Sequence, residues 1–122
     1  MRPLLQIALD LTDEKRALEI ADLIAPMIDI LEVGTPLLKA VGVGIITGLK
    51  QLYPNKLILA DTKTMDVGGV EAELVFKARA DMMTVCAAAP LETIKAAITK
   101  TRLLSKTIVV DFIGIKLSLI HI

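Results

Sequence analysis

Three charged residues follow a short apolar run near the middle of the sequence. The run ends at Ala60, and Asp61, Lys63 and Asp66 follow it closely. A lysine between carboxylates keeps its proton, because nearby opposite charges favour the charged form of each group. Such an ammonium can stabilise or protonate an anion that develops on a substrate. The spacing therefore predicts a catalytic cluster, although a purely structural ion pair would use the same residue types.

A fourth charged residue, Glu32, lies near the end of an earlier apolar run, IDILEVG (residues 28–34). Magnesium prefers one or two carboxylates together with substrate oxygens and water. Glu32 and Asp61 would supply two such ligands if their strands were neighbours. Glu32 taken alone could also be a solvated residue at a strand end, so the sequence leaves both interpretations open.

Five short apolar runs predict β-strands over residues 4–10, 28–34, 57–63, 82–88 and 107–114. The segments between them have helical periodicity, with an N-cap at Thr12 or Asp13 and another at Thr35 before Pro36. Alternating strands and helices predict βαβ units and a parallel sheet. The near-continuous apolar strands predict a sheet that is covered on both faces.

The period of two along a strand places acidic residues at the carboxyl ends of four predicted strands: Asp10, Glu32, Asp61 and Asp111. A (β/α)8 barrel and a doubly wound sheet both bind ligands at that end. The barrel is favoured, because its strand ends converge on one mouth and no glycine fingerprint follows the first strand. The segment GVGIITG (residues 42–48) has its third glycine one place too late for a nucleotide loop, so we predict helix and turn there.

Composition excludes several classes of protein. The apolar fraction of 54% is enough for a core, and 14 basic against 14 acidic residues argue against a nucleic-acid binder. No apolar run approaches the roughly 18 residues of a membrane span, and Asp10, Asp13 and Glu14 interrupt the start that resembles a signal peptide. Cys86 is the single cysteine. These features predict a soluble cytoplasmic protein.

Five stretches carry a resemblance to the orotidine 5'-monophosphate decarboxylase superfamily: LQIALD, DILEVGTPL, LADTKTMDVGG, ADMMTVCAAA and VVDFIGI. The sequence KTMD with the glycine pair that follows is similar to the hexulose-phosphate synthase branch, more than to the keto-gulonate-phosphate decarboxylase branch. The resemblance implies a (β/α)8 TIM barrel, of which residues 1–115 would form an N-terminal part with about five parallel strands. Residues 116–122 depart from the family pattern, and we expect a truncation or an out-of-frame tail there.

The resemblance also implies an activity. The family branch is an aldehyde-lyase that joins formaldehyde to ribulose 5-phosphate, a sugar phosphate, and gives hexulose 6-phosphate through an enediolate stabilised by Mg2+. By this resemblance Glu32 and Asp61 would bind the magnesium ion. Lys63 would stabilise the enediolate and help to move its proton. A decarboxylase acting on a keto-sugar phosphate or on orotidine 5'-phosphate is an alternative, and a noncatalytic half-barrel is another.

Three further acids receive roles from the same resemblance. Asp10 would line the site as a catalytic and substrate-binding residue. Asp66 would be catalytic in the site of the partner subunit, because the family forms homodimers. Asp111 would either contact the substrate or have a structural role.

Overall fold

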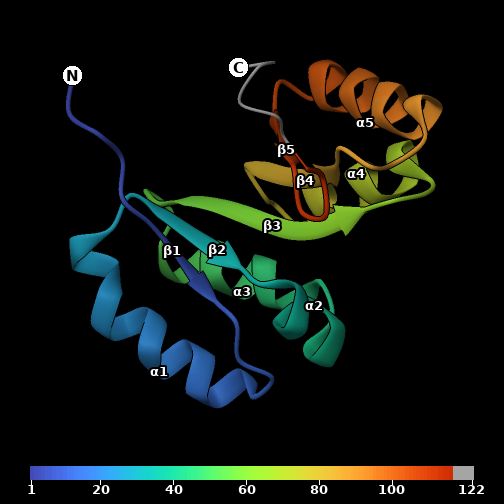
Figure 1. Cartoon of the computed structure of the whole chain (residues 1–122). Helices are drawn as coiled ribbons and strands as arrows, with labels where there is room; N and C mark the ends of the chain where they lie inside the picture. The colour runs from blue at the N-terminus through green and yellow to red at the C-terminus, as the bar shows by residue number, and fades with distance from the viewer. Residues whose placement is uncertain (117–122) are drawn as a thin grey trace.

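A computed structural model describes residues 1–116 and contains one sheet of five parallel strands (Figure 1). The strands are β1 (Gln6–Leu9), β2 (Ile30–Val33), β3 (Leu57–Thr64), β4 (Met82–Cys86) and β5 (Thr107–Asp111). They pair in the consecutive order β1-β2-β3-β4-β5. The predicted parallel sheet is confirmed. Four of the strands are shorter than the apolar runs that predicted them, and the expected tail after Lys116 lies outside the described residues.

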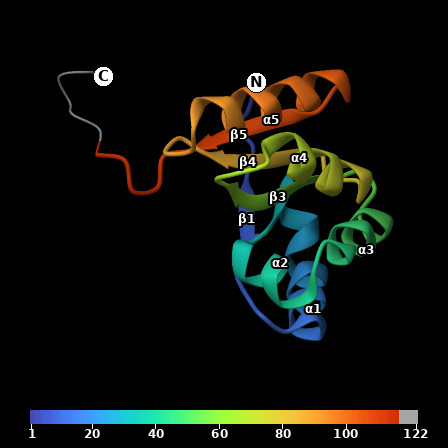
Figure 2. The same cartoon turned by 90° about the vertical axis from the view of Figure 1, so that its right-hand side faces the viewer.

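Helices occupy the connections between the strands. They are α1 (Glu14–Ile24), α2 (Thr35–Val41), α3 (Gly44–Leu52), α4 (Gly68–Lys77) and α5 (Leu91–Leu103), with a short 3-10 turn, η1 (Ala25–Met27), after α1. Figures 1 and 2 show the helices along one side of the curved sheet. None of the helices within residues 1–116 is long and apolar enough to cross a membrane.

Two of the predicted local signals behave as expected and one does not. Asp13 caps α1, because its carboxylate accepts a hydrogen bond from the backbone N–H of Arg16 at 2.7 Å. The segment GVGIITG forms the turn after α2 and the first residues of α3, as predicted. The N-cap of α2, however, is Gly34 and not Thr35. Thr35 is already helical, which leaves its hydroxyl free to reach β3.

The core lies between the sheet and the helices. Outward-facing strand residues such as Leu31, Ile58 and Met83 pack there against helix residues such as Ala17 and Leu49, and all five are fully buried. The other face of the sheet is more open, because no helix of residues 1–116 covers it. The prediction that both faces of every strand are covered is therefore wrong for the two outer strands, where Gln6, Ala8 and Val109 are exposed.

Strand order and register decide which residues meet at the open face. Parallel strands in consecutive order with helices on the outside form the wall of a (β/α) barrel, whereas a doubly wound sheet reverses its strand order at a switch point. Glu32 of β2 pairs with Leu59 of β3, so Asp61 lies one pleat further along the neighbouring strand. The carboxyl ends of all five strands point to the same edge, where the predicted acids lie.

Candidate active site

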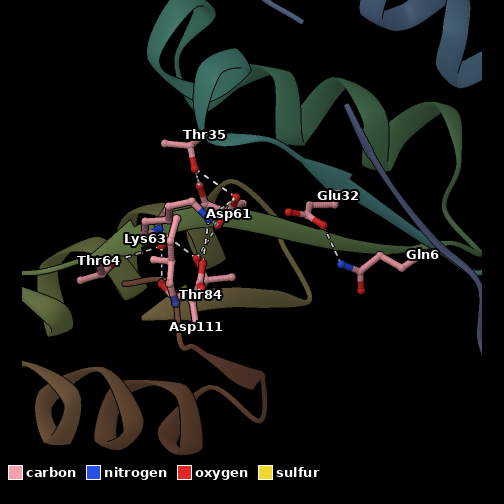
Figure 3. A network of polar contacts seen from close by, with 10 residues as sticks. Gln6, Glu32, Thr35, Asp61, Lys63, Thr64, Thr84 and Asp111 are labelled. Atoms are coloured by element: carbon pink, nitrogen blue, oxygen red, sulfur yellow. Dashed lines mark hydrogen bonds and ion pairs between the residues drawn. The ribbon is translucent and has the colours of Figure 1, made fainter. Parts of the chain in front are cut away.

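Lys63 lies at the centre of the polar cluster at this edge (Figure 3). Its Nζ atom donates to Asp111 Oδ2 at 2.7 Å and lies 3.0 Å from Asp61 Oδ2 and 3.2 Å from Asp61 Oδ1. The hydrogen bond with Asp111 is the main cause that raises the pKa of Lys63. Burial lowers this pKa, and the hydrogen bond with Asp61 raises it further. The same hydrogen bond with Lys63 lowers the pKa of Asp111. Lys63 is therefore an ammonium group between two carboxylates, as the sequence predicted.

One of the two carboxylates differs from the prediction. The spacing predicted Asp61 and Asp66 as the neighbours of Lys63, and the structure places Asp61 and Asp111 there. Asp66 is exposed in the turn before α4, and its Oδ1 atom accepts a hydrogen bond from the backbone N–H of Val67 at 2.8 Å. The reason is geometric, because the chain leaves the sheet after Thr64 and takes Asp66 away from the Lys63 ammonium.

Asp61 is held by two threonines that the sequence reasoning did not assign to the site. Its side chain is 8% exposed. Thr35 Oγ1 can donate its one proton to the Asp61 carbonyl oxygen at 2.7 Å or to Asp61 Oδ2 at 3.0 Å, while Thr84 Oγ1 donates to Asp61 Oδ1 at 2.8 Å. Thr35 had been interpreted as a helix cap. Thr84 lies in the fourth predicted strand (residues 82–88), whose end was expected to meet the other strand ends, and that position is the signal that indicates its role.

The backbone at Lys63 is irregular. Its φ angle is +44°, in the left-handed region that non-glycine residues seldom adopt. The pairing of β3 with β4 also shifts here, because β3 advances from Ala60 to Thr64 while β4 advances from Met83 to Val85. Such irregularities cluster near active sites, where they turn a side chain in a new direction. Asp61 and Lys63 thus meet through a distorted strand end and not through regular strand alternation.

Glu32 lies beside this cluster and is half-buried (Figure 3). Its Oε2 atom accepts a hydrogen bond from Gln6 Nε2 at 2.6 Å. Burial is the main cause that raises the pKa of Glu32; the Gln6 bond opposes it, and the charges of Asp61 and Asp10 add to it. The three carboxylates are thus close enough to repel one another. A cation would relieve that repulsion.

The donor chemistry of this edge fits magnesium. Glu32 and Asp61 offer hard oxygen ligands on adjacent strands, which is the small carboxylate set that magnesium takes alongside water and substrate oxygens. Within residues 1–116 no three His, Cys, Asp or Glu side chains are arranged to hold a metal ion by themselves. The fit is therefore to an ion that keeps several non-protein ligands.

Asp10 follows β1 and lies against Gly34. A Cβ atom on Gly34 would be 1.9 Å from Asp10 Oδ1, so the carboxylate occupies space that only glycine leaves open. This contact brings Asp10 to the same edge as Glu32 and Asp61. The structure therefore brings together five of the six predicted site residues, and Asp66 is the exception.

A family profile and known proteins agree with this geometry. The profile for the "Orotidine 5'-phosphate decarboxylase / HUMPS family" matches residues 3–120. The 3-hexulose-6-phosphate synthase of Mycobacterium gastri is 46% identical over 112 residues, which are 92% of this chain and 54% of that protein. The 3-keto-L-gulonate-6-phosphate decarboxylase of Escherichia coli is 38% identical over 112 residues, or 92% of this chain and 52% of that protein.

Solved structures give the same result. A crystal structure of 3-hexulose-6-phosphate synthase superposes with a TM-score of 0.92 at 46% identity, over 93% of this chain and 55% of that one. The chain thus spans about half the length of the relatives that it matches, and its five strands correspond to part of their TIM barrel. By the profile, the relatives and the superposition together, the chain belongs to the orotidine 5'-phosphate decarboxylase / HUMPS family.

Proposed function

We propose that the chain is part of an aldehyde-lyase of the 3-hexulose-6-phosphate synthase type, which joins formaldehyde to ribulose 5-phosphate and gives hexulose 6-phosphate. The observation that carries the proposal is the Lys63 ammonium, held 2.7 Å from Asp111 and 3.0 Å from Asp61 at the strand ends beside Glu32. The 46% identity with the Mycobacterium gastri synthase supports this branch of the family.

The proposed reaction begins with transfer of a proton from a carbon next to the carbonyl group of the sugar phosphate to a carboxylate at the strand ends, for which we propose Asp10. The electron pair of the broken C–H bond delocalises into the carbonyl group and leaves an enediolate. Its nucleophilic carbon then attacks the carbonyl carbon of formaldehyde, a C–C bond forms, and the new alkoxide takes up a proton. The negative charge that develops on oxygen is what the site has to stabilise.

Lys63 is suited to that task. Its raised pKa keeps it protonated at neutral pH, so it can donate a proton but cannot remove one. Its positive charge stabilises the enediolate oxygens, and its proton can pass to a substrate atom during turnover. Asp61 and Asp111 hold the Nζ atom in place. We propose that Asp10 and Asp111 also contact the substrate at the strand ends.

Glu32 and Asp61 would hold the magnesium ion. When bound, the ion would supply positive charge close to the oxygens on which negative charge develops. Burial and the nearby charges of Asp61 and Asp10 raise the pKa of Glu32, because they disfavour its ionised form. A cation at this position would offset these effects, which supports the proposal. The two threonines on Asp61 would keep its carboxylate oriented toward the site.

A decarboxylase is the second candidate. The Escherichia coli relative supports it, and so does a solved structure of KGPDC from Streptococcus mutans in complex with a sugar phosphate, with a TM-score of 0.90 and 35% identity. An ammonium between carboxylates would stabilise the anion left by the loss of carbon dioxide equally well. The two candidates therefore differ in substrate and not in the role of Lys63.

The test uses the full-length gene product that contains this chain. It is assayed with ribulose 5-phosphate plus formaldehyde, with 3-keto-L-gulonate 6-phosphate and with orotidine 5'-monophosphate, each with magnesium or with excess EDTA. We expect turnover of the first pair, its loss in EDTA, and a fall in kcat of about 100-fold or more in Lys63→Ala. Lys15→Ala, an exposed lysine of α1, is the control. Turnover of a decarboxylase substrate alone would refute the synthase, and full activity in EDTA would refute the magnesium site.

We also propose that the active protein is a homodimer to which Asp66 contributes across the subunit boundary. Exposed apolar residues Val67, Val70 and Leu74 follow Asp66 along one side of α4, and they support an interface there. Mixing Asp66→Ala with Lys63→Ala subunits should restore part of the activity, because hybrid dimers would have one intact site. No recovery despite demonstrated subunit exchange would contradict the shared site.

A further inference from the structure

Thr84 makes two hydrogen bonds that connect the candidate catalytic residues. It lies in β4 and is 5% exposed. Its Oγ1 atom accepts the backbone N–H of Lys63 at 2.8 Å and donates to Asp61 Oδ1 at 2.8 Å (Figure 3). A hydroxyl has one proton and two lone pairs, so both bonds form at once without competition. One hydroxyl group thus binds the main chain of Lys63 and the side chain of Asp61.

The Lys63 amide needs this bond because the sheet does not provide one. Regular pairing between β3 and β4 stops at Ala60 with Met83 and resumes at Thr64 with Val85. Lys63 lies in the shifted segment with a φ angle of +44°. In this segment the Thr84 hydroxyl accepts the Lys63 N–H in place of a backbone carbonyl. The left-handed conformation of Lys63 is therefore held by a side chain from the next strand.

A second contact strengthens the connection between the same two strands. Thr62 Oγ1 donates to the Thr84 carbonyl oxygen at 2.6 Å. The main chain of Thr84 thus holds Thr62, and its side chain holds the Lys63 amide that follows. If the hydroxyl were removed, the segment could relax toward a regular strand, which would turn the Lys63 side chain away from Asp111.

We propose that Thr84 is a positioning residue, whose hydroxyl fixes the distorted backbone of Lys63 and the carboxylate of Asp61 in the arrangement that catalysis requires. The inference rests on the proposed function for its catalytic part, since it takes Lys63 and Asp61 as the working groups. Its structural part concerns the order of the Lys63 backbone and does not depend on any substrate.

Two comparisons separate the hydroxyl from the packing around it. Thr84→Val keeps the shape of the side chain and removes the hydroxyl, whereas Thr84→Ser keeps the hydroxyl and removes a methyl group. Thr101→Val is the matched control elsewhere in the protein. Thr101 is 2% exposed, and its hydroxyl donates to the Ala97 carbonyl of its own helix at 2.7 Å.

The first measurement is amide hydrogen exchange of Lys63 in the chain of residues 1–122. We expect exchange at least about 10-fold faster in Thr84→Val, and rates within about threefold of the parent in Thr84→Ser and Thr101→Val. The second measurement is kinetics in the full-length gene product. We expect kcat to fall about 10- to 100-fold in Thr84→Val, as for other groups that orient catalytic ligands, with KM within about threefold. Thr84→Ser should restore kcat.

Unchanged Lys63 exchange and unchanged kcat in Thr84→Val would overturn the proposal. Equal damage in Thr84→Ser and Thr84→Val would also overturn it, because packing would then be the cause. If Thr84→Val does not fold, Thr84→Ser against Thr84→Ala decides the same question, since these two differ only in the hydroxyl. If the parent protein has no activity on any tested substrate, the proposed function fails, and the exchange comparison still decides whether Thr84 orders Lys63.

Discussion

Replacing Gly34 by alanine should destabilise the fold through one steric contact at the active-site edge. Gly34 has φ −63° and ψ 153°, which any residue adopts, so backbone strain does not enter. A Cβ atom there would be 1.9 Å from Asp10 Oδ1 and 2.6 Å from the Leu9 carbonyl oxygen. The Asp10 side chain can rotate away. The Leu9 carbonyl cannot, because it belongs to β1 and accepts the Gly34 N–H at 3.0 Å.

The size of the effect follows from this contact. Inserting a methyl group into a packed site typically costs about 1–3 kcal/mol, because the neighbours must move. With a urea m-value of about 2 kcal/mol/M for a small protein, a cost of about 2 kcal/mol lowers the unfolding midpoint by about 1 M. The displaced β1 would also take Asp10 away from Glu32 and Asp61. We therefore expect loss of stability together with loss of activity.

The matched control is Gly48→Ala. Gly48 lies inside α3, and no atom comes within 4 Å of its added Cβ. Alanine is about 0.8–1 kcal/mol more favourable than glycine in a helix, so this variant should raise the urea midpoint. The same chemical change should thus have opposite signs at the two positions, measured by circular dichroism in urea. A midpoint for Gly34→Ala equal to or above that of the parent would refute the steric reasoning.

Two further predictions concern charge and pH. Glu32→Gln should raise the urea midpoint at pH 7, because burial penalises the ionised carboxylate of the parent protein. This penalty is full above the raised pKa of the folded state, so the gain should fade as the pH falls toward the ordinary value of 4.5. A lower midpoint for Glu32→Gln at pH 7 would contradict the prediction. Asp111→Asn should lower the urea midpoint at pH 7, because the hydrogen bond from the Lys63 ammonium lowers the pKa of Asp111 and so stabilises the folded state. That stabilisation is present above the ordinary pKa of 3.8 and is lost as the pH falls through the lowered pKa of the folded state. A difference between the parent and Asp111→Asn that does not change with pH would exclude an ionic origin.

The sequence predicted the parts of the fold that depend on local pattern. Strand and helix alternation was readable because buried strands are short apolar runs and helices have their own period. The position of Glu32 and Asp61 at neighbouring strand ends followed from the consecutive parallel order. The contact between Asp61 and Lys63 was also predicted, since the two residues are close in the chain.

The remaining features depend on register and on distant residues. The partner of Lys63 is Asp111, which is 48 residues away, and the local sequence does not say which acid approaches the ammonium. The shift between β3 and β4 decides where Lys63 points, and no residue in that segment is a glycine that would have indicated a left-handed backbone. Thr35 was assigned to a cap because threonine before proline has that local use, whereas its hydroxyl is used by a strand 26 positions later. The exposure of Val109 depends on what covers the sheet, which an apolar run does not reveal.

The consecutive strand order also sets the sequence in which the charges meet while the chain is being synthesised. The ribosome extends the chain from its N-terminus at about 5–20 residues per second, so the strands become available in chain order. Asp10, Glu32 and Asp61 emerge first, and Lys63 follows Asp61 after two residues. A counter-charge is therefore available as soon as the third strand can pair. Thr84, 23 residues beyond Asp61, adds the next constraint, and Asp111 is the last to arrive, 48 residues after Lys63. In the nascent chain the Lys63 ammonium is therefore present before β4 and β5, the strands that carry Thr84 and Asp111. We expect the Lys63 ammonium to acquire its final geometry only when the fifth strand has joined the sheet.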